Sequence, residues 1–223
     1  MWQLQARRLL YRNRVAGTAL QDSWRKPLPS TGSDWRRVSF LVVDAEMSSL
    51  DVNEGELLSV GWVIVENASI ALSSARHYLV RAERSVGQSA TIHNLRDCDM
   101  EEAETRAFVL QRFLEAAAGC VLVAHNASLD LAYLNRVSRR EFNAPVLMPV
   151  VDTMLQERAL MERRDQAIRQ GDLRLQSCRD RYGLPPFPAH NAMLDALATA
   201  ELLLAMAAHR SVGEPISLGQ LLG

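Results

Sequence analysis

The stretch from Ser39 to Glu46, SFLVVDAE, constrains the fold more than any other part of the chain. Its first half is apolar and β-branched, which is typical of a central strand buried on both faces. Asp44 and Glu46 close the run two positions apart, so their side chains project from the same face of a strand. Two carboxylates held side by side repel each other unless a cation neutralises them. The pattern therefore predicts a buried strand whose carboxyl end carries an acidic pair.

The apolar pattern after this strand changes from strands to an alternation of helices and strands. Two strands over 57–67 and 70–81 are split by a turn at Glu66–Ser69. A capping box at Asp99 and Glu102 predicts a helix that runs to about residue 118. The remaining elements are expected as strand 120–125, helix 128–140, strand 147–152, helix 153–168, short helix 173–185 and long helix 190–210. This order predicts an α/β fold in layers, with a mixed central sheet flanked by helices.

Charge is spread unevenly along the 223 residues, although the total is only −1. Residues 1–37 carry eight basic and two acidic side chains, a net +6, which leaves −7 for the rest. We predict a basic N-terminal helical extension and linker over 1–37, a main domain over 38–210 and a C-terminal tail over 211–223. The basic segment either steers nucleic acid or docks on a partner, or it is an amphipathic helix that covers the body.

Cysteines and apolar runs bear on the cellular compartment. Cys98, Cys120 and Cys178 are far apart and form no CxxC pair, which suits a reducing compartment. No apolar stretch is expected to reach the ~18 residues of a membrane span, because Thr199 and Glu201 interrupt the longest candidate. The N-terminus lacks the apolar core of a secretory signal, and its Arg-rich, acid-poor start leaves a mitochondrial presequence as a minor alternative. We therefore expect a cytoplasmic protein without a membrane partner.

A third acidic residue follows the strand at 120–125. Asp130 falls in the first turn of the next helix, for which Ser128 is the expected N-cap. Asp130 either joins Asp44 and Glu46 in one site or only favours the positive end of the helix dipole. Asp152 has the same position after the following strand, and there we expect a plain N-cap.

His190 and Asp195 lie at the start of the last long helix. Five positions on one helix would separate them by roughly 140° and keep them out of a common site. Prolines at 185, 186 and 188 prevent an earlier start, and Asn191 is a good N-cap. We therefore expect Asp195 one turn into the helix and His190 on the loop before it. Histidine at such a position can exchange a proton near neutral pH, as a general base does.

At these residues the chain resembles the DEDDh family of 3′–5′ exonucleases. That family includes the proofreading epsilon subunit of bacterial replicative polymerase, ribonuclease T and oligoribonuclease, and its fold is ribonuclease H-like. The resemblance runs from about Phe40 to Leu204 and covers most of the chain. It rests on the ordered motifs DAEMSSL, ATIHNL, VAHNASLD, VVDTMLQERAL, RYGLP and HNAMLDA. The expected fold is therefore the three-layer ribonuclease H-like one over residues 38–210.

The resemblance implies a role for each residue of the acidic set. The metal ligands would be the four carboxylates, and the general base would be His190; the set is Asp44, Glu46, Asp130, Asp195 and His190. An all-oxygen ligand set implies two Mg²⁺ or Mn²⁺ ions. One ion would activate the attacking water and the other would stabilise the leaving 3′ oxygen. The products would be nucleoside 5′-monophosphates released from a 3′ end.

The substrate pocket is where the chain departs from the family. The family commonly reads Thr-Thr-Gly-Leu after the first glutamate, where this chain has Met47–Ser48–Ser49–Leu50. Ser49 in place of glycine limits how closely the backbone can approach the terminal nucleotide. Leu50 is a suitable wedge against the last base. Further substrate contacts are expected at His93, in a segment that often touches the nucleotide, and at His125 and Asn126.

Three functions are compatible with these residues. The first is an exonuclease acting on 3′ ends of single-stranded DNA; the second is an exoribonuclease or oligoribonuclease that trims RNA. The third is a non-catalytic module that binds nucleic acid or a polymerase, and the intact acidic set argues against it. Proofreading would need a polymerase partner in trans, and a homodimer is a further expectation from free-standing members. If the basic segment steers the substrate, deletion of 1–37 weakens binding most at low salt.

Overall fold

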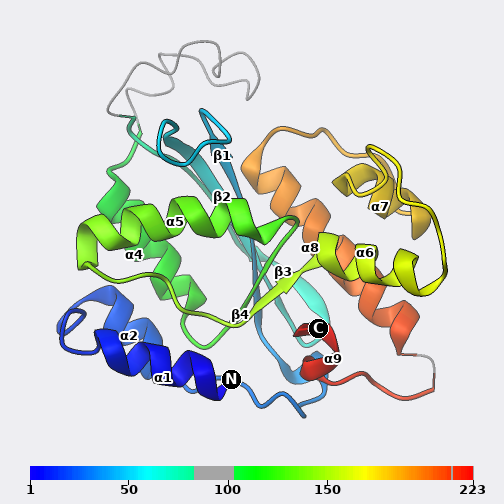
Figure 1. Cartoon of the computed structure of the whole chain (residues 1–223), viewed down its shortest axis with the longest axis horizontal. Helices are drawn as coiled ribbons and strands as arrows, with labels where there is room; N and C mark the ends of the chain where they lie inside the picture. The colour runs from blue at the N-terminus through cyan, green and yellow to red at the C-terminus, as the bar shows by residue number, and fades with distance from the viewer. Residues whose placement is uncertain (83–102, 212, 223) are drawn as a thin grey trace.

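The computed structural model describes residues 1–82, 103–211 and 213–222. Its five-stranded sheet has the order β3-β2-β1-β4-β5 (Figure 1). The strands are β1 (Phe40–Met47), β2 (Leu57–Glu66), β3 (Ser69–Leu79), β4 (Val121–Ala124) and β5 (Val150–Asp152). The pairs β1–β2 and β2–β3 are antiparallel, whereas β1–β4 and β4–β5 are parallel. The predicted mixed sheet is confirmed, with β1 at its centre.

The β2–β3 hairpin forms where the sequence predicts it. Asn67 and Ala68 both have positive φ, 52° and 55°. Two left-handed residues in succession are the conformation of the two-residue turn whose twist matches that of the flanking strands. The turn thus lets β2 and β3 pair along nearly their full length.

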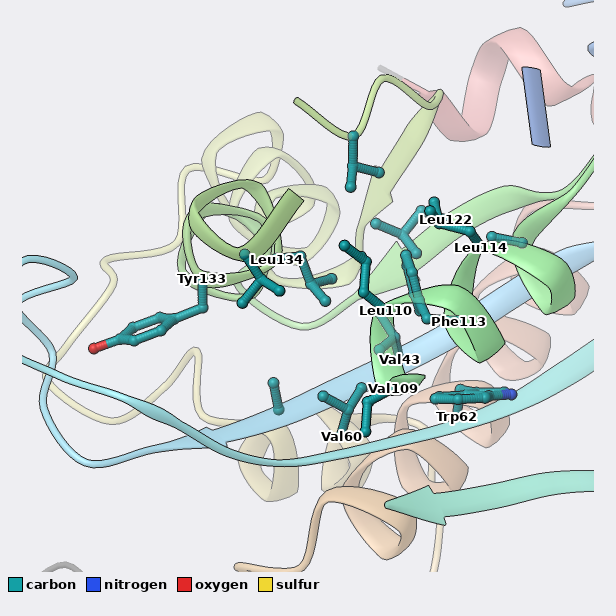
Figure 2. Close-up of a cluster of buried hydrophobic side chains, with 14 of the residues drawn as sticks. Val43, Val60, Trp62, Val109, Leu110, Phe113, Leu114, Leu122, Tyr133 and Leu134 are labelled. Carbon is teal, nitrogen blue, oxygen red and sulfur yellow. The ribbon is translucent and has the colours of Figure 1, made fainter. Parts of the chain in front are cut away.

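Helices cover both faces of the sheet. Alternate strand residues point to opposite faces, and the sheet accordingly has two apolar cores. Val43, Trp62 and Leu122 pack on one face against α4 and α5 (Figure 2), and Val42 and Val63 pack on the other against α8. The helices are α1 (Trp2–Tyr11), α2 (Ala19–Arg25), the 3₁₀ helix η1 (Trp35–Arg37), α4 (Arg106–Ala117), α5 (Ala127–Phe142), α6 (Thr153–Arg163), α7 (Leu175–Arg181), α8 (Ala192–Arg210) and α9 (Leu218–Leu222). The ribonuclease H-like three-layer arrangement is confirmed.

Several predicted helix boundaries are wrong, and the short helix predicted over 173–185 is limited to α7, Leu175–Arg181. Asp99 and Glu102 lie outside the described residues, but residues 103–105 are not helical, and α4 begins only at Arg106. Its N-cap is Thr105, whose hydroxyl accepts a hydrogen bond from the Phe108 amide. The N-cap position of the helix after β4 is Asn126, not Ser128, and the Asn126 side chain makes no capping hydrogen bond. The helix predicted over 153–168 ends at Arg163, and Asp165 already has a positive φ of 51°.

The segment 1–37 packs against the body. Val15 and Leu20 are fully buried in the core shared with α4 and α5. The Arg8 guanidinium donates to the Leu147 carbonyl, just before β5, and Lys26 lies against Gly119, just before β4. These contacts place the segment at the amino ends of the parallel strands, and in Figure 1 it lies at the bottom while β1 ends at the top. The segment 1–37 therefore covers the body, which is the second of the two alternatives that the sequence left open for it.

The C-terminal tail also folds onto this end of the molecule. Leu218 and Leu221 of α9 are buried. The amides of Leu218 and Gly219 donate to the carbonyls of Ser33 and Thr31. The two ends of the chain therefore hold each other on the sheet.

One expectation about membranes needs correction. α8 has 19 residues and a mean hydropathy of 1.4, so by length and composition it could cross a bilayer. Its apolar side chains have another use, because Ala200, Leu203 and Ala207 belong to the core against the sheet. The apolar composition of α8 is explained by its position as the central helix of one layer, packed against the sheet.

Candidate active site

The acidic pair occupies the carboxyl end of β1. Asp44 and Glu46 point to the same side of the sheet, and only 9% of Glu46 is exposed. The pairing of β1 with β2 shifts register between Glu46 and Met47. A bulge of this kind re-aims side chains at the end of a ladder, and β1 ends one residue after the second carboxylate, at Met47, which pairs with Leu57.

Gly61 makes room for the third carboxylate. It pairs with Asp44 across the β1–β2 ladder, and the first turn of α8 lies directly on it. A Cβ at this position would come within 2.3 Å of the Met193 nitrogen. The bare backbone of β2 therefore lets α8 approach closely enough to bring Asp195 to the acids of β1. Sequence reasoning missed Gly61, although a glycine inside an apolar strand signals such a close approach.

The start of α8 is fixed as predicted. Asn191 is the N-cap, and its side-chain oxygen accepts from the amides of Met193 and Leu194. In return, the Asp195 carboxylate accepts from the Asn191 amide at 2.9 Å. His190 stays on the loop before the helix. This reciprocal capping fixes the carboxylate one turn into α8.

Three carboxylates converge on one point. Oxygen atoms of Asp44, Glu46 and Asp195 all lie within 4.8 Å of one another. Asp130 is only 5% exposed, and its Oδ1 accepts from the Ala45 amide at 3.0 Å. Its negative charge acts on Asp44 and Glu46, so it lies beside the group although it is not one of the three converging acids.

Burial raises the pKa of each of these acids, and repulsion by neighbouring acids of the cluster adds to the shifts of Asp44 and Glu46. Burial raises the pKa of Asp44 well above its usual range, and the charges of Asp130, Asp195 and Glu46 add to the shift. Burial also raises the pKa of Glu46 to about 7 and that of Asp130 to about 7. The pKa of Asp195 is raised as well, because burial outweighs its amide bond and the nearby His190. Carboxylates in such a state fit a divalent cation, whose charge would compensate theirs.

His190 faces the same cleft. This cleft, of about 430 Å³, is lined by Asp44, Ala45, Glu46, Met47, Ser48, Ser49, Leu50, Leu129, His190 and Asp195. His190 is exposed and has a positive φ of 68°, a conformation that is uncommon outside glycine. An exposed imidazole beside clustered acids can accept a proton from a bound water.

A buried arginine holds the loop that carries His190. Arg179 of α7 is only 1% exposed, and its guanidinium donates to the Pro185 carbonyl at 2.9 Å and to the Ala198 carbonyl of α8 at 2.7 Å. The same group lies over the Phe187 ring at 5.0 Å and pairs with Glu201. The loop 184–190 is thereby tied to α8. Nothing in the local sequence around Arg179 indicates this contact.

The cleft wall predicted to bind the terminal nucleotide is a fixed loop. Ser48 closes it, because its amide donates to the Glu56 carbonyl and its hydroxyl accepts from the Glu56 amide. The Tyr133 hydroxyl of α5 donates to the Ser49 carbonyl at 2.7 Å. Leu50 stands on this loop with 80% of its surface exposed, as a wedge against a base would require.

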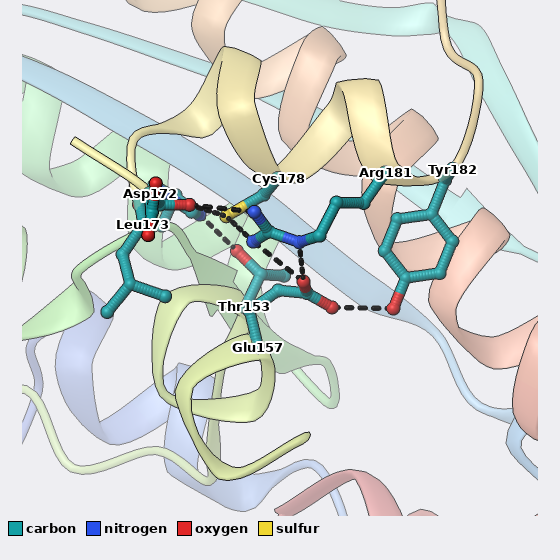
Figure 3. A network of polar contacts seen from close by, with 8 residues as sticks. Thr153, Glu157, Asp172, Leu173, Cys178, Arg181 and Tyr182 are labelled. Carbon is teal, nitrogen blue, oxygen red and sulfur yellow. Dashed lines mark hydrogen bonds and ion pairs between the residues drawn. The ribbon is translucent and has the colours of Figure 1, made fainter. Parts of the chain in front are cut away.

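The structure does not bring the predicted substrate contacts His125 and Asn126 into the cleft lining. His93 lies outside the described residues. Burial lowers the pKa of His125, and its Nε2 donates to the Leu173 carbonyl, which leaves Nδ1 of the neutral ring to accept from the Thr153 hydroxyl. Thr153 and Leu173 belong to the network that joins α6 to α7 through Glu157, Arg181 and Tyr182 (Figure 3).

Asn126 and Asp152 form contacts at the starts of α5 and α6. Asn126 is exposed but lies outside the cleft lining, in a left-handed conformation with a φ of 73°. The Asp152 carboxylate caps its own helix, as predicted, and also accepts from the amides of Asn126 and Ala127. One carboxylate thus caps both α5 and α6.

A ribonuclease H-like sheet with acids clustered at the carboxyl end of its central strand defines a class of phosphodiester-cleaving enzymes. The chain belongs to the RNase_T family, described as exonucleases, whose sequence model matches residues 41–203. The matched range runs from the start of β1 into α8 and so includes every acid of the cleft.

Relatives with related sequences are bacterial replication proteins. The chain is 26% identical over 184 residues to a DNA polymerase III subunit epsilon of Treponema pallidum, covering 80% of this chain and 83% of that protein. It is 27% identical over 176 residues to a DNA polymerase III PolC-type of Thermotoga petrophila. That match covers 78% of this chain and only 12% of the relative, so most of the PolC-type protein has no counterpart here.

Solved structures support the fold. Exonuclease I of E. coli, in complex with a dT13 oligonucleotide, superposes with a TM-score of 0.66 at 15% identity, covering 78% of this chain and 42% of that one. Cell-death related nuclease 4 gives a TM-score of 0.65 at 14% identity, with 78% and 65% covered. At such identities the likeness concerns the fold alone.

Proposed function

We propose that this protein is a 3′–5′ exonuclease that removes nucleoside 5′-monophosphates from single-stranded DNA with the help of two divalent cations. The observation that carries the proposal is the convergence of Asp44, Glu46 and Asp195 within 4.8 Å, in a cleft shared with an exposed histidine. The names of the relatives, DNA polymerase III subunits, support DNA as the substrate. They also support a polymerase as a partner in trans.

The carboxylates hold the cations. Asp44, Glu46 and Asp195 would bind one of them directly, and Asp130 would help to hold the second through the oxygen that does not accept from Ala45. The oxygen-only donor set fits Mg²⁺ or Mn²⁺. When bound, the cations supply the positive charge that the reacting phosphate requires.

The remaining residues of the cleft act on water and on the nucleotide. His190 accepts the proton of the attacking water at a ring nitrogen, for which its exposed loop position is suited. Leu50 packs against the terminal base, and the fixed loop of Met47, Ser48 and Ser49 holds the terminal sugar and base. The bond between the phosphorus and the 3′ oxygen of the preceding nucleotide breaks, and this oxygen takes up a proton from solvent and remains as the new 3′ hydroxyl of the shortened strand.

The proposal is tested with matched single-stranded DNA and RNA oligonucleotides labelled at either end, in Mn²⁺, Mg²⁺ or EDTA. We expect metal-dependent release of mononucleotides from the 3′ end, faster on DNA. Glu46→Gln should abolish release while oligonucleotide binding is retained. Glu66→Gln, the same change at the exposed far end of β2, should leave it intact.

Each other outcome selects a different function. Faster release from RNA would assign the cleft to RNA trimming. Binding without hydrolysis by the wild-type protein in either metal would indicate a non-catalytic binding module. A homodimer stays a prediction, which light scattering of the purified protein checks.

A further inference from the structure

A second hollow lies beside the cleft, along the exposed side of α5. It has a volume of about 620 Å³. Its lining comes from the β1–β2 loop and from α5, namely Val52, Asn53, Ala132, Asn135, Arg136, Arg139 and Arg140. We call it the α5 groove. Leu129 of the same helix lines the cleft, so α5 contributes a wall to both hollows.

The exposed face of α5 leads from the cleft into the groove. Residues seven and four apart lie on one side of a helix, so Leu129, Arg136 and Arg140 form one line. Ala132 and Arg139 form a second line next to it. From Leu129 to Arg139 the helix rises by about 15 Å, because each residue adds about 1.5 Å. A strand lying along this face would pass from the cleft to the arginines without leaving the surface of α5.

The opposite wall of the groove is rigidly attached to α5. The Arg136 guanidinium donates to the Gly55 carbonyl at 2.6 Å and also to the Val52 carbonyl. Tyr133 holds the same loop nearer to the cleft. A Cβ on Gly55 would come within 1.9 Å of the Tyr133 hydroxyl oxygen, so only glycine permits this contact. Cleft and groove therefore keep a constant position relative to each other.

The groove is positively charged although the body is acidic. The hydrogen bonds of Arg136 go to carbonyl oxygens and leave its charge without a carboxylate partner there. Arg139 is exposed, and its side chain makes no hydrogen bond or ion pair with the described residues. The arginines also interact favourably with the helix dipole at the C-terminal end of α5. This interaction does not cancel the positive field that they produce in the groove. Such a field attracts a polyanion.

We propose that the single strand upstream of the terminal nucleotide lies in the α5 groove. The terminal nucleotide would occupy the cleft at Leu50, and phosphates further along the strand would contact Arg139 and the outer side of Arg136. The amides at the start of α5 cannot serve these phosphates, because Asp152 already accepts from Asn126 and Ala127. This inference rests on the proposed exonuclease function, which it extends with a path for the strand.

The experiment compares substrates too short to reach the groove with substrates that cross it. Arg139→Glu and wild type are assayed on the p-nitrophenyl ester of thymidine 5′-monophosphate and on a single-stranded dodecanucleotide, at several salt concentrations. Arg158→Glu, the same charge change at an exposed position of α6, is the matched control.

For Arg139→Glu we expect KM for the dodecanucleotide to rise about three- to tenfold, with unchanged kinetics on the small ester. Removal of one phosphate contact should reduce the slope of log KM against log salt by about 0.7. Equal effects of Arg139→Glu and Arg158→Glu, or an unchanged KM and salt slope, would overturn the inference while leaving the exonuclease intact. An inactive wild type on both substrates would instead reject the proposed function itself.

Discussion

At the scale of single residues, the missing side chain of Gly61 matters as much as the carboxylates around it. Its backbone lies against the first turn of α8, which fixes how closely Asp195 approaches β1. Because the neighbouring atoms belong to the backbone of Ala192 and Met193, they cannot turn aside as a side chain would. Any larger residue must move the helix.

Gly61→Ala is therefore expected to displace Asp195 and lower kcat by about a hundredfold, since small misplacements of catalytic groups have effects of that size. Overpacking should also cost about 1–3 kcal/mol of unfolding free energy. Kinetics and urea denaturation measure the two effects. Gly32→Ala is the control, because a Cβ there would meet nothing closer than 3.8 Å. A Gly61→Ala enzyme with normal kcat would contradict this role.

The raised pKa values of the acids predict how stability changes with pH. The pKa of Glu46 and that of Asp130 are about 7 in the folded protein, against 4.5 and 3.8 for the ordinary groups. Between the ordinary pKa values and a pH of about 7, the folded state binds more protons than the unfolded state. The free energy of unfolding therefore falls as pH rises through this range. The metal-free protein should therefore melt at a lower temperature at pH 8 than at pH 5.

Cations should reverse this loss, since a ligand that binds only the folded state at a hundred times its Kd adds about 2.7 kcal/mol. Thermal melts in EDTA and in Mn²⁺ at both pH values test this. Asp44→Asn should melt higher than wild type in EDTA at pH 8 and should respond less to Mn²⁺. A wild-type melting temperature that is independent of pH and of metal would count against the acidic cluster as a cation site.

At the scale of secondary-structure elements, α7 acts as a support for the loop before α8. Its Arg179 connects Pro185 to Ala198, and no other described side chain makes both contacts. Arg181, two residues further, instead ties α7 to Glu157 of α6. The two arginines therefore support different sides of α7.

Arg179→Lys should lower kcat roughly tenfold, because a lysine cannot make both directed bonds and His190 loses its fixed position. The acidic limb of the kcat/KM pH profile, which reports the general base, should flatten or shift. Arg181→Lys, which changes the α6 side of α7, should keep the profile. Loss of stability with an unchanged pH profile would assign Arg179 a purely structural role.

At the scale of the whole molecule, the segment 1–37 is part of the folded body. Leu20→Ala should destabilise the protein by about 2–5 kcal/mol, as truncation of a fully buried leucine does. Leu9→Ala, at a position 64% exposed, should change the free energy of unfolding by less than about 0.5 kcal/mol. Urea titrations at one temperature compare them. Equal and small effects would show that the segment folds independently of the core.

This packing changes how steering by the basic segment must be tested. Deletion of 1–37 would remove core residues, so weaker binding by the truncated chain would not report on charge. The segment also lies at the amino ends of β4 and β5, whereas the cleft lies at the carboxyl end of β1. Its role in substrate binding stays a prediction.

Much of the site could be predicted because its signals are local. The two-residue spacing of Asp44 and Glu46 at the end of an apolar run places both side chains on one face of a strand. The N-cap at Asn191 and the prolines before it place His190 on the loop and Asp195 in the helix. None of these inferences requires knowledge of the tertiary structure. Gly61 and Arg179 could not be predicted in the same way, because their contacts depend on how separate segments pack. For the same reason, the motif that contains His125 does not predict that this histidine contacts Thr153 and Leu173.

The attachment of α1 suggests how the native protein opens. None of the ten residues of α1 is buried, and its polar link to the body is mainly the Arg8 guanidinium on the carbonyls of Leu147 and Trp24. Elements with so little buried surface unfold locally, far below the free energy of global unfolding. Amide protons of α1 should consequently exchange with solvent long before those of β1 and α8, because this helix can detach while the sheet stays folded.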